Sequence, residues 1–276
     1  MEIVKRLIPT PLKQRIKTYR EDKERVRLFG DLAPLVPPVK SMFDGTASLS
    51  DFKANGEEFL KIYKDVCGLK ADESMLDVGS GIGRKTLPLT QYFSERGLYQ
   101  GMNVTKAGVD WCRDKISSRF PNFHFQHIDV YNNLYNPNGR TLPGEFRFPF
   151  EDESFNFVML GSVFTHMLPA ELEHYLFEIR RVMKTDGRCL ISYFLLNDES
   201  LSLIEAGKST LDFKYVHEEY RVVSEETPEA AIAFDQQWVE RLYQKLGLKI
   251  KRLDFGSWCG REHYLSYQDL VLAFKV

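Results

Sequence analysis

Short apolar runs alternate with amphipathic stretches along the middle of the chain. The pattern predicts strands at residues 75–78, 99–104, 123–129, 155–161 and 188–196, and helices near 84–96, 106–118 and 169–184. The last of these helices has one apolar stripe that includes Leu172, Leu176 and Ile179, and Gly187 follows it. Repeated strand–helix units favour a parallel sheet with right-handed crossovers and helices on both faces.

Two further regions flank this alternating segment. Upstream, the segment that starts at Asn55 and ends at Gly68 predicts one helix with an N-terminal cap and a closing glycine. Downstream, apolar or aromatic residues occupy every second position from Leu211 to His217, which predicts a short hairpin before a helix at 235–246. We expect residues 197–233, called the lid segment below, to cover a site at the carboxyl ends of the strands.

The first 45 residues read as an arm of broken helices, because several prolines interrupt them. Residues 1–29 carry nine Lys or Arg against four acids. Basic residues interleaved with Ile and Leu suit peripheral contact of residues 1–30 with an anionic membrane. An arm that folds over the site explains the same residues without a membrane.

Composition narrows the class of protein. The chain has 276 residues, 43% of them hydrophobic, and a formal charge of −2, which gives no reason to expect a nucleic-acid partner. The four cysteines are too widely spaced for a zinc knuckle or a dense disulfide framework, and no metal site is expected. No apolar run approaches the ~20 residues needed to span a bilayer. We expect a reduced, cytoplasmic protein; its oligomeric state is not indicated.

The stretch MLDVGSGIGRKT, residues 75–86, carries the strongest chemical signal. Gly79, Gly81 and Gly83 fall in the turn after the first predicted strand, where bare backbone lets a ligand approach. A dinucleotide fingerprint would need a glycine at position 84, which is Arg84, and a P-loop would need a glycine where the same arginine stands. Both phosphate-binding interpretations therefore fail at one residue.

What remains is the pattern D-x-G-x-G-x-G, with Asp77 just before the turn. A carboxylate there attracts an ammonium group, and a helix N-terminus attracts a carboxylate, so the ligand has the charges of an amino acid. The arrangement resembles motif I of the class I methyltransferases that use S-adenosylmethionine. The resemblance implies that cofactor, with Asp77, Gly79, Ser80, Gly81 and Gly83 around its methionyl part.

The resemblance extends over about residues 55–195. It implies that Asn103, at a position where the family usually has an acid, binds the ribose, with Val104 beside it. It also implies that Asp129 and Val130 bind the adenine. The segment FRFPFEDESFNFVMLGSVFTHM resembles the family's approach to strand four and adds Gly161 and Ser162, although Asn156 replaces the usual Asp. An aspartate at position 103 would be expected to bind the cofactor more tightly.

The fold that this resemblance implies is an α/β, doubly wound, mostly parallel seven-stranded sheet of Rossmann-like type with an antiparallel last strand. The sixth strand and its approach are expected at 246–255 and the seventh at 268–276. Residues 46–276 would form the methyltransferase domain, with residues 1–45 as the arm and the lid segment inserted after strand five.

The acceptor would lie near the loop 256–267 or under the lid segment. Candidate substrate-binding residues are Tyr193, His217, Trp258, Arg261, His263 and Tyr264. His166, just after strand four, is the candidate general base, with the alternative that it only packs or caps a helix.

The preferred function is methyl transfer to a small polar metabolite, such as a sugar or a natural-product intermediate. One alternative is a membrane-surface lipid or quinone methyltransferase. The other is a non-catalytic, cofactor-binding pseudoenzyme, which is favoured by Asn103 and Asn156 at positions where acids are usual. A nicotinamide-dependent oxidoreductase ranks last because of Arg84.

Overall fold

The computed structural model describes residues 10–43 and 46–276. Residues 1–9 of the predicted arm lie outside the described residues, and so do residues 44 and 45. Statements about the arm below concern residues 10–43.

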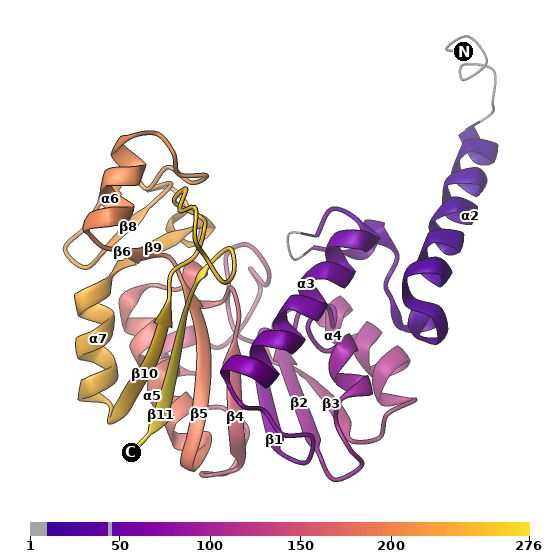
Figure 1. The fold of residues 1–276 in the computed structure, drawn as a ribbon, viewed down its shortest axis with the longest axis horizontal. Helices are drawn as coiled ribbons and strands as arrows, with labels where there is room; N and C mark the ends of the chain where they lie inside the picture. The colour runs from indigo at the N-terminus through magenta and orange to yellow at the C-terminus, as the bar shows by residue number, and fades with distance from the viewer. Residues whose placement is uncertain (1–9, 44–45) are drawn as a thin grey trace.

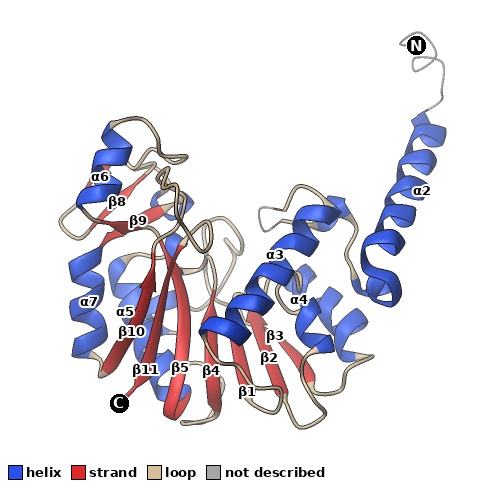
Figure 2. Cartoon of the chain, in the orientation of Figure 1, coloured by secondary structure: helices blue, strands red, loops and turns tan. Residues whose placement is uncertain are grey.

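A seven-stranded sheet forms the centre of the molecule (Figures 1 and 2). Its strands are β1 (Ser74–Val78), β2 (Leu98–Asn103), β3 (Phe123–His127), β4 (Phe155–Leu160), β5 (Met183–Tyr193), β10 (Leu248–Asp254) and β11 (Asp269–Lys275). The spatial order is β10-β11-β5-β4-β1-β2-β3, and only β11 runs antiparallel to its neighbours. The predicted α/β fold with an antiparallel last strand is confirmed.

Helices cover both faces of this sheet (Figure 1). On one face lie α3 (Leu49–Lys61) and α4 (Lys106–Cys112), and on the other α5 (Pro169–Val182) and α7 (Gln236–Lys245). Successive residues of β1 face opposite sides, so Met75 packs with Phe59 of α3 whereas Leu76 belongs to the cluster that contains Leu176 of α5. Because β1 to β5 are parallel, their carboxyl ends lie at one edge of the sheet, between these two helix layers.

A second, smaller sheet stands beyond the carboxyl end of β5. Its order is β6 (Leu195–Leu196), β9 (Ile232–Asp235), β8 (Tyr220–Val222) and β7 (Tyr215–Val216), and α6 (Asp198–Glu205) lies beside it at the top of the view in Figure 1. The predicted hairpin is present as the β7–β8 pair, in which Tyr215 lies opposite Val222. This layer contains most of the lid segment.

Two helix predictions differ from the structure. Helix α3 begins at Leu49 and not near Asn55, because Ser48 is the N-cap and its hydroxyl accepts from the Asp51 amide at 3.1 Å. The predicted helix at 84–96 is only the 3-10 helix η4 (Leu87–Gln91). Pro88 has no amide hydrogen to continue an α-helix there. The glycine turn is therefore not followed by an α-helix whose dipole could hold an anion.

The N-terminal arm also differs from the prediction of broken helices. Helix α2 (Thr10–Phe29) is continuous over 20 residues, because Pro11 falls in its first turn, where a proline is tolerated. It projects from the rest of the chain (Figure 1), and the short turns η1 (Gly30–Leu35) and η2 (Val39–Ser41) lead back to α3. Within the described residues, no helix is both long and apolar enough to cross a bilayer.

Candidate functional site

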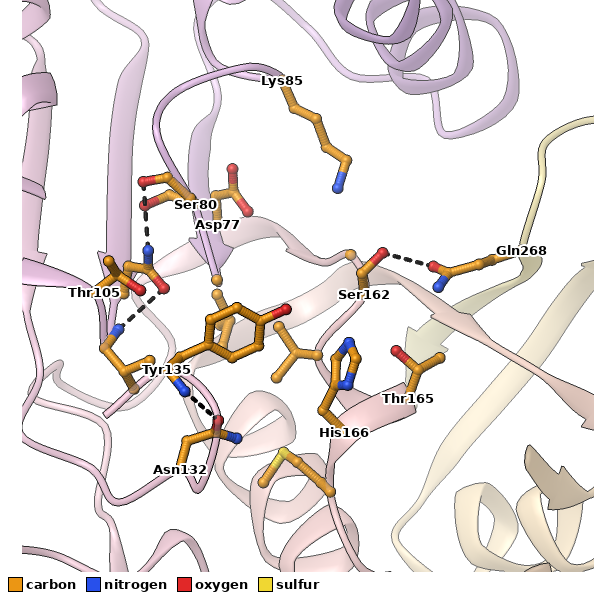
Figure 3. Close-up of a pocket in the computed structure, with 18 of the residues that line it drawn as sticks. Asp77, Ser80, Lys85, Thr105, Asn132, Tyr135, Ser162, Thr165, His166 and Gln268 are labelled. Atoms are coloured by element: carbon orange, nitrogen blue, oxygen red, sulfur yellow. Dashed lines mark hydrogen bonds between the residues drawn. The ribbon is translucent and has the colours of Figure 1, made fainter. Parts of the chain in front are cut away.

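A cavity of about 500 Å³ opens at the carboxyl ends of the parallel strands (Figure 3). One part, called the glycine end below, is lined by Asp77–Gly81, Lys85 and Asn103 after β1 and β2. The opposite part, called the lid end, is lined by residues that follow β4 and β5: Thr165, His166, Met167, Phe194, Leu211 and Ala231, together with Tyr135. This cavity lies at the predicted location, the carboxyl ends of the strands.

The glycine turn has the backbone that its sequence predicts. Gly79, Gly81 and Gly83 have φ of 84°, 60° and 87°, a region that residues with a side chain rarely adopt. Packing adds a second constraint, because a Cβ on Gly79 would stand 2.4 Å from Cγ2 of Val163, which also lines the cavity. The turn therefore requires glycine at position 79 for both conformation and space.

Asp77 is buried at the end of β1 and lines the cavity. Its Oδ2 accepts a hydrogen bond from the Tyr99 hydroxyl at 2.7 Å, and Tyr99 in turn bonds Thr86. Burial raises the pKa of Asp77, while the charge of Lys85 and the Tyr99 bond act in the opposite direction. A cationic ligand group beside this carboxyl would compensate the burial of its charge.

Lys85, which was not among the residues predicted for the site, supplies a positive charge. Its Nζ lies 4.7 Å from the centre of the Phe59 ring and would stand 2.4 Å from a Cβ on Gly161, so the ammonium reaches the end of β4. Figure 3 shows the side chain extending toward the Asp77 side of the cavity. The predicted helix dipole is absent at this turn, and Lys85 offers an anion a full charge instead. Its position two residues after Gly83 was the available signal.

Asn103 lines the glycine end from β2, as expected. Its Oδ1 accepts from the Val104 amide at 3.0 Å, and its Nδ2 donates to the Gly81 carbonyl at 3.4 Å. The amide thus connects the end of β2 to the glycine turn and is held at the cavity wall. Val104 lines the same wall.

Asp129 lies outside the residues that line the cavity, although its neighbour Val130 lines it. The Asp129 carboxylate pairs with Arg140 of the following loop, and the Arg140 bond lowers its pKa. The structure therefore brings Val130, but not the Asp129 side chain, to the predicted adenine position. The sequence around Asp129 does not indicate that Arg140, eleven residues later, pairs with it.

The turn after β4 forms the junction between the two ends. Gly161 and Ser162 line the cavity, and Ser162 has a φ of 60°. Its amide donates to the Ser192 hydroxyl at 2.7 Å, and both the Ser162 and Ser192 hydroxyls donate to Oε1 of Gln268. Figure 3 shows the bond between Ser162 and Gln268. These bonds hold a strained turn in place between β4, β5 and β11.

His166 lines the lid end and is oriented by the lid segment. Its Nδ1 lies 2.7 Å from the Glu229 carbonyl, and its ring meets the Tyr135 ring edge-on at 5.9 Å. Burial lowers the pKa of His166, against the backbone carbonyls of Glu229 and Ala230, which raise it. A carbonyl only accepts, so Nδ1 carries the proton in the neutral ring and Nε2 is the basic nitrogen.

The six predicted substrate-binding residues do not line the cavity. Trp258 and Arg261 are buried beside Asp269, which accepts from Trp258 Nε1 at 2.7 Å and from Arg261 Nη1 at 3.2 Å. The Tyr193 hydroxyl bonds that of Tyr243 at 3.0 Å in the core. The other three lie outside the cavity: His217 is stacked on Tyr220, and His263 and Tyr264 are exposed.

Asn156 has a structural explanation. It lies at the start of β4, and its Oδ1 accepts from the amide and the hydroxyl of Ser74 and from Lys184 Nζ, at 2.8–3.1 Å. It therefore joins the amino ends of β1 and β4, far along the strand from the cavity edge. The presence of Asn156 in place of the usual Asp therefore does not change the residues that line the cavity.

Comparison with known proteins gives a coherent result for the central segment. The sequence model of a family described as "Methyltransferase domain" matches residues 76–191. A tRNA N(3)-cytidine methyltransferase from Gallus gallus is 28% identical over 133 residues, which cover 47% of this chain and 32% of that enzyme. The chain thus matches about a third of the length of that relative.

Solved structures share the fold at low sequence identity. The PH0226 protein of Pyrococcus horikoshii OT3 has a TM-score of 0.56 at 16% identity, covering 92% of this chain and 99% of that one. A 1,6-didemethyltoxoflavin-N1-methyltransferase of Burkholderia thailandensis, solved with S-adenosylhomocysteine, has a TM-score of 0.54 at 15% identity, with 86% and 85% covered. The magnesium protoporphyrin IX methyltransferase of Synechocystis PCC 6803 also has 0.54 at 14%, with 96% and 100% covered.

Proposed function

Residues 76–191 form a methyltransferase domain of the class I, S-adenosylmethionine-dependent family, and from this premise we propose that the protein transfers a methyl group to a small molecule. The observation that carries the proposal is the cavity itself: one end has the charges of an amino-acid receptor, and it continues into a second, uncharged end. S-adenosylmethionine supplies an electrophilic sulfonium methyl group. The protein has to hold an acceptor in line with that group and exclude water.

The residues at the glycine end fit the methionyl part of this cofactor. Asp77 offers a buried carboxylate to its ammonium group, and Lys85 offers an ammonium to its carboxylate. The Ser80 hydroxyl and Asn55 Oδ1 are buried, line the cavity and have no hydrogen-bond partner among the described residues. Buried polar atoms without partners are costly, so their presence along this wall favours a polar ligand.

The ribose and adenine would lie toward β2 and β3. Asn103 is positioned for the ribose, with Val104 and Val130 as apolar surfaces beside it. The adenine would then be held by backbone and apolar contacts, since Asp129 is engaged with Arg140. Gly161 and Ser162 would face the sulfur at the junction of the two ends.

A small-molecule acceptor is favoured by the lid segment. The lid segment and the loop that contains Tyr135 close over the cavity from two sides, leaving room for a compact molecule. Two structural relatives are named for small molecules, 1,6-didemethyltoxoflavin and magnesium protoporphyrin IX. The relative named for tRNA keeps RNA as a competing acceptor. Four buried free thiols suit a reducing, cytoplasmic setting.

Calorimetry and label transfer test the proposal. S-adenosylhomocysteine should bind with one site per chain, and NAD should give no saturable heat. With methyl-labelled S-adenosylmethionine and a cell extract, label should appear in the low-molecular-weight fraction. NAD binding without S-adenosylhomocysteine binding would overturn the cofactor assignment. Label only in the RNA fraction would overturn the small-molecule acceptor, and cofactor binding without transfer to any fraction would indicate a pseudoenzyme.

One observation favours a second acceptor class, a lipid-linked molecule. Helix α2 projects from the chain, and Tyr19 and Val26 on it are 60% and 61% exposed among basic residues. We infer that an anionic membrane would be the partner of this helix in that case. Flotation with anionic liposomes, with and without residues 1–30, tests it. Equal recovery of the full chain and of the variant without residues 1–30 in the floated fraction would show that this helix does not bind the membrane.

A further inference from the structure

The lid end of the cavity is uncharged. Among the described residues that line the cavity, the side chains that are charged at neutral pH are Asp77, Arg84 and Lys85, and all three belong to the glycine end. The lid end is lined by apolar or aromatic side chains, including Met167, Phe194, Leu211, Ala231 and Tyr135. A phosphate or carboxylate on the acceptor would find no cation there, and burying such a charge unpaired is costly.

Two acceptor oxygens near the lid end are already committed to the protein. Oε1 of Gln268 accepts from two serine hydroxyls, Ser162 and Ser192. Oδ1 of Asn132 accepts from the amides of Leu134 and Tyr135, at 3.0 and 2.9 Å. The hydroxyl groups of a sugar would find these two acceptors already in use.

Thr165 carries a buried hydroxyl that is not committed in this way. Its side chain is fully buried and lines the cavity, and its Oγ1 has no hydrogen-bond partner within the described part of the chain. A buried hydroxyl without a partner costs about 1–3 kcal/mol, so a ligand that supplies one gains that free energy. Figure 3 shows Thr165 beside His166 on the same wall. The two consecutive residues thus present one hydroxyl and one imidazole to the same space.

His166 complements this hydroxyl. With Nδ1 directed at the Glu229 carbonyl, Nε2 can accept a proton. Burial lowers the pKa of the ring, so it is neutral and ready to accept at physiological pH. A base of this strength takes a proton usefully from a phenol, whose pKa is about 10 as in tyrosine, and much less so from an aliphatic alcohol.

Resting on the proposed methyltransferase function, we propose that the acceptor is an uncharged aromatic molecule with one reacting hydroxyl, held in the lid end by Thr165 Oγ1 with His166 as its general base. The aromatic ring packs among the apolar side chains of the lid end, and the hydroxyl forms polar contacts with Thr165 Oγ1 and His166 Nε2. Thr165 and His166 are then a binding and a catalytic residue for the same oxygen.

The reaction balances in atoms and charge. The acceptor oxygen forms a bond to the methyl carbon as the carbon–sulfur bond breaks, and that electron pair stays on sulfur. The phenolic proton passes to Nε2 of His166 and from there to solvent. The products are a methyl aryl ether, S-adenosylhomocysteine and one proton.

Binding of matched probes tests the acceptor class without turnover. In the presence of saturating S-adenosylhomocysteine, 2-naphthol should bind at least about tenfold more tightly than 6-hydroxy-2-naphthoate or methyl glucoside, as measured by calorimetry or naphthol fluorescence. Tighter binding of the carboxylate or of the sugar, or no saturable naphthol binding, would overturn the proposal. Measuring S-adenosylhomocysteine first separates this failure from failure of the proposed function.

Variants test the two residues. Thr165→Val keeps the shape and should weaken naphthol binding about fivefold, the value of one neutral hydrogen bond, while Thr165→Ser restores it. Tyr264→Phe, outside the cavity, is the matched control and should leave it unchanged. Equal naphthol affinities in the wild type and Thr165→Val would remove Thr165 from the site.

His166→Gln should lower turnover of labelled methyl onto naphthol about 100-fold, with naphthol affinity within about threefold of the wild type. Because the lowered pKa keeps the imidazole neutral, wild-type kcat/KM should stay level from pH 8 down to about 6.5 and fall only below it. The variant should lose this acid limb. A wild-type acid limb that persists in His166→Gln would overturn the assignment of the base.

Discussion

The two ends of the cavity are built in different ways. Most of the glycine end comes from one continuous stretch, Asp77–Lys85, to which β2 adds Asn103. Its shape is set by the backbone, with left-handed glycines and a turn packed on Val163, and Asp77 and Lys85 place opposite charges at the two ends of the stretch. The lid end is assembled from side chains of separate segments, the turn after β4, the loop with Tyr135 and the segment after β5. A site built from one backbone turn suits a cofactor that many enzymes share. A site built from side chains of separate segments suits an acceptor that differs from one enzyme to the next.

Gly79→Ala should separate the two ends most strongly. The new Cβ would stand 2.4 Å from Val163 at a φ of 84°, so S-adenosylhomocysteine affinity should fall by about 100-fold or more, which corresponds to about 2.7 kcal/mol. Gly144→Ala, where a Cβ meets nothing within 4 Å, is the control. Calorimetry measures both, with thermal unfolding to verify folding. Unchanged affinity in Gly79→Ala would show that the ligand does not depend on this turn.

Asp77→Asn tests whether the glycine end recognises an ammonium group. The amide keeps the size and the Tyr99 contact but loses the charge, so affinity for S-adenosylhomocysteine should fall about tenfold, the value of one charge-assisted hydrogen bond. Affinity for 5′-methylthioadenosine, which lacks the amino and carboxylate groups, should not change. A parallel loss for both ligands would mean that Asp77 only supports the fold.

Lys85→Met asks the same question of the carboxylate. The variant keeps a long apolar side chain against Phe59 and removes the charge, and S-adenosylhomocysteine should bind about fivefold more weakly because this side chain is partly exposed and screened by solvent. Binding of 5′-methylthioadenosine serves again as the internal reference. The loss should shrink at high salt; a loss that is insensitive to salt would argue against a charge contact.

Asn103→Asp should have the smallest effect. A carboxylate would strengthen bonds to ribose hydroxyls but would lose the 3.4 Å bond from Nδ2 to the Gly81 carbonyl, so the net gain in S-adenosylhomocysteine affinity should be about two- to fivefold. Titration of S-adenosylhomocysteine into both proteins measures it. Looser binding would indicate that the contact with Gly81 outweighs any contact with the ribose.

The same difference explains what could be predicted from the sequence. The glycine end could be located because spacing within one turn determines its geometry, and the strand pattern fixed its place in the sheet. The residues that the structure adds there have local causes: Pro88 ends the expected helix, and Lys85 then provides the charge. Arg140, eleven residues after Asp129, is a longer-range partner that no motif announces.

The lid end could be predicted only in part. His166 was a candidate because it follows β4, and it lines the cavity. Trp258 and Arg261 do not, because both donate to Asp269, a buried acid that needs donors. Conversely, Thr165 looks ordinary in the sequence, and its importance depends on having no partner in three dimensions. Whether a polar group has a hydrogen-bond partner depends on which residues the fold brings next to it, and the sequence pattern does not show this.

A crystal structure with S-adenosylhomocysteine bound would locate each part of the cofactor in the cavity. We expect the amino-acid part between Asp77 and Lys85, with the sulfur at the Gly161–Ser162 turn and facing Thr165 and His166 across an open acceptor space. Adenine at the Asp77 side, or a sulfur directed away from Thr165 and His166, would contradict this placement.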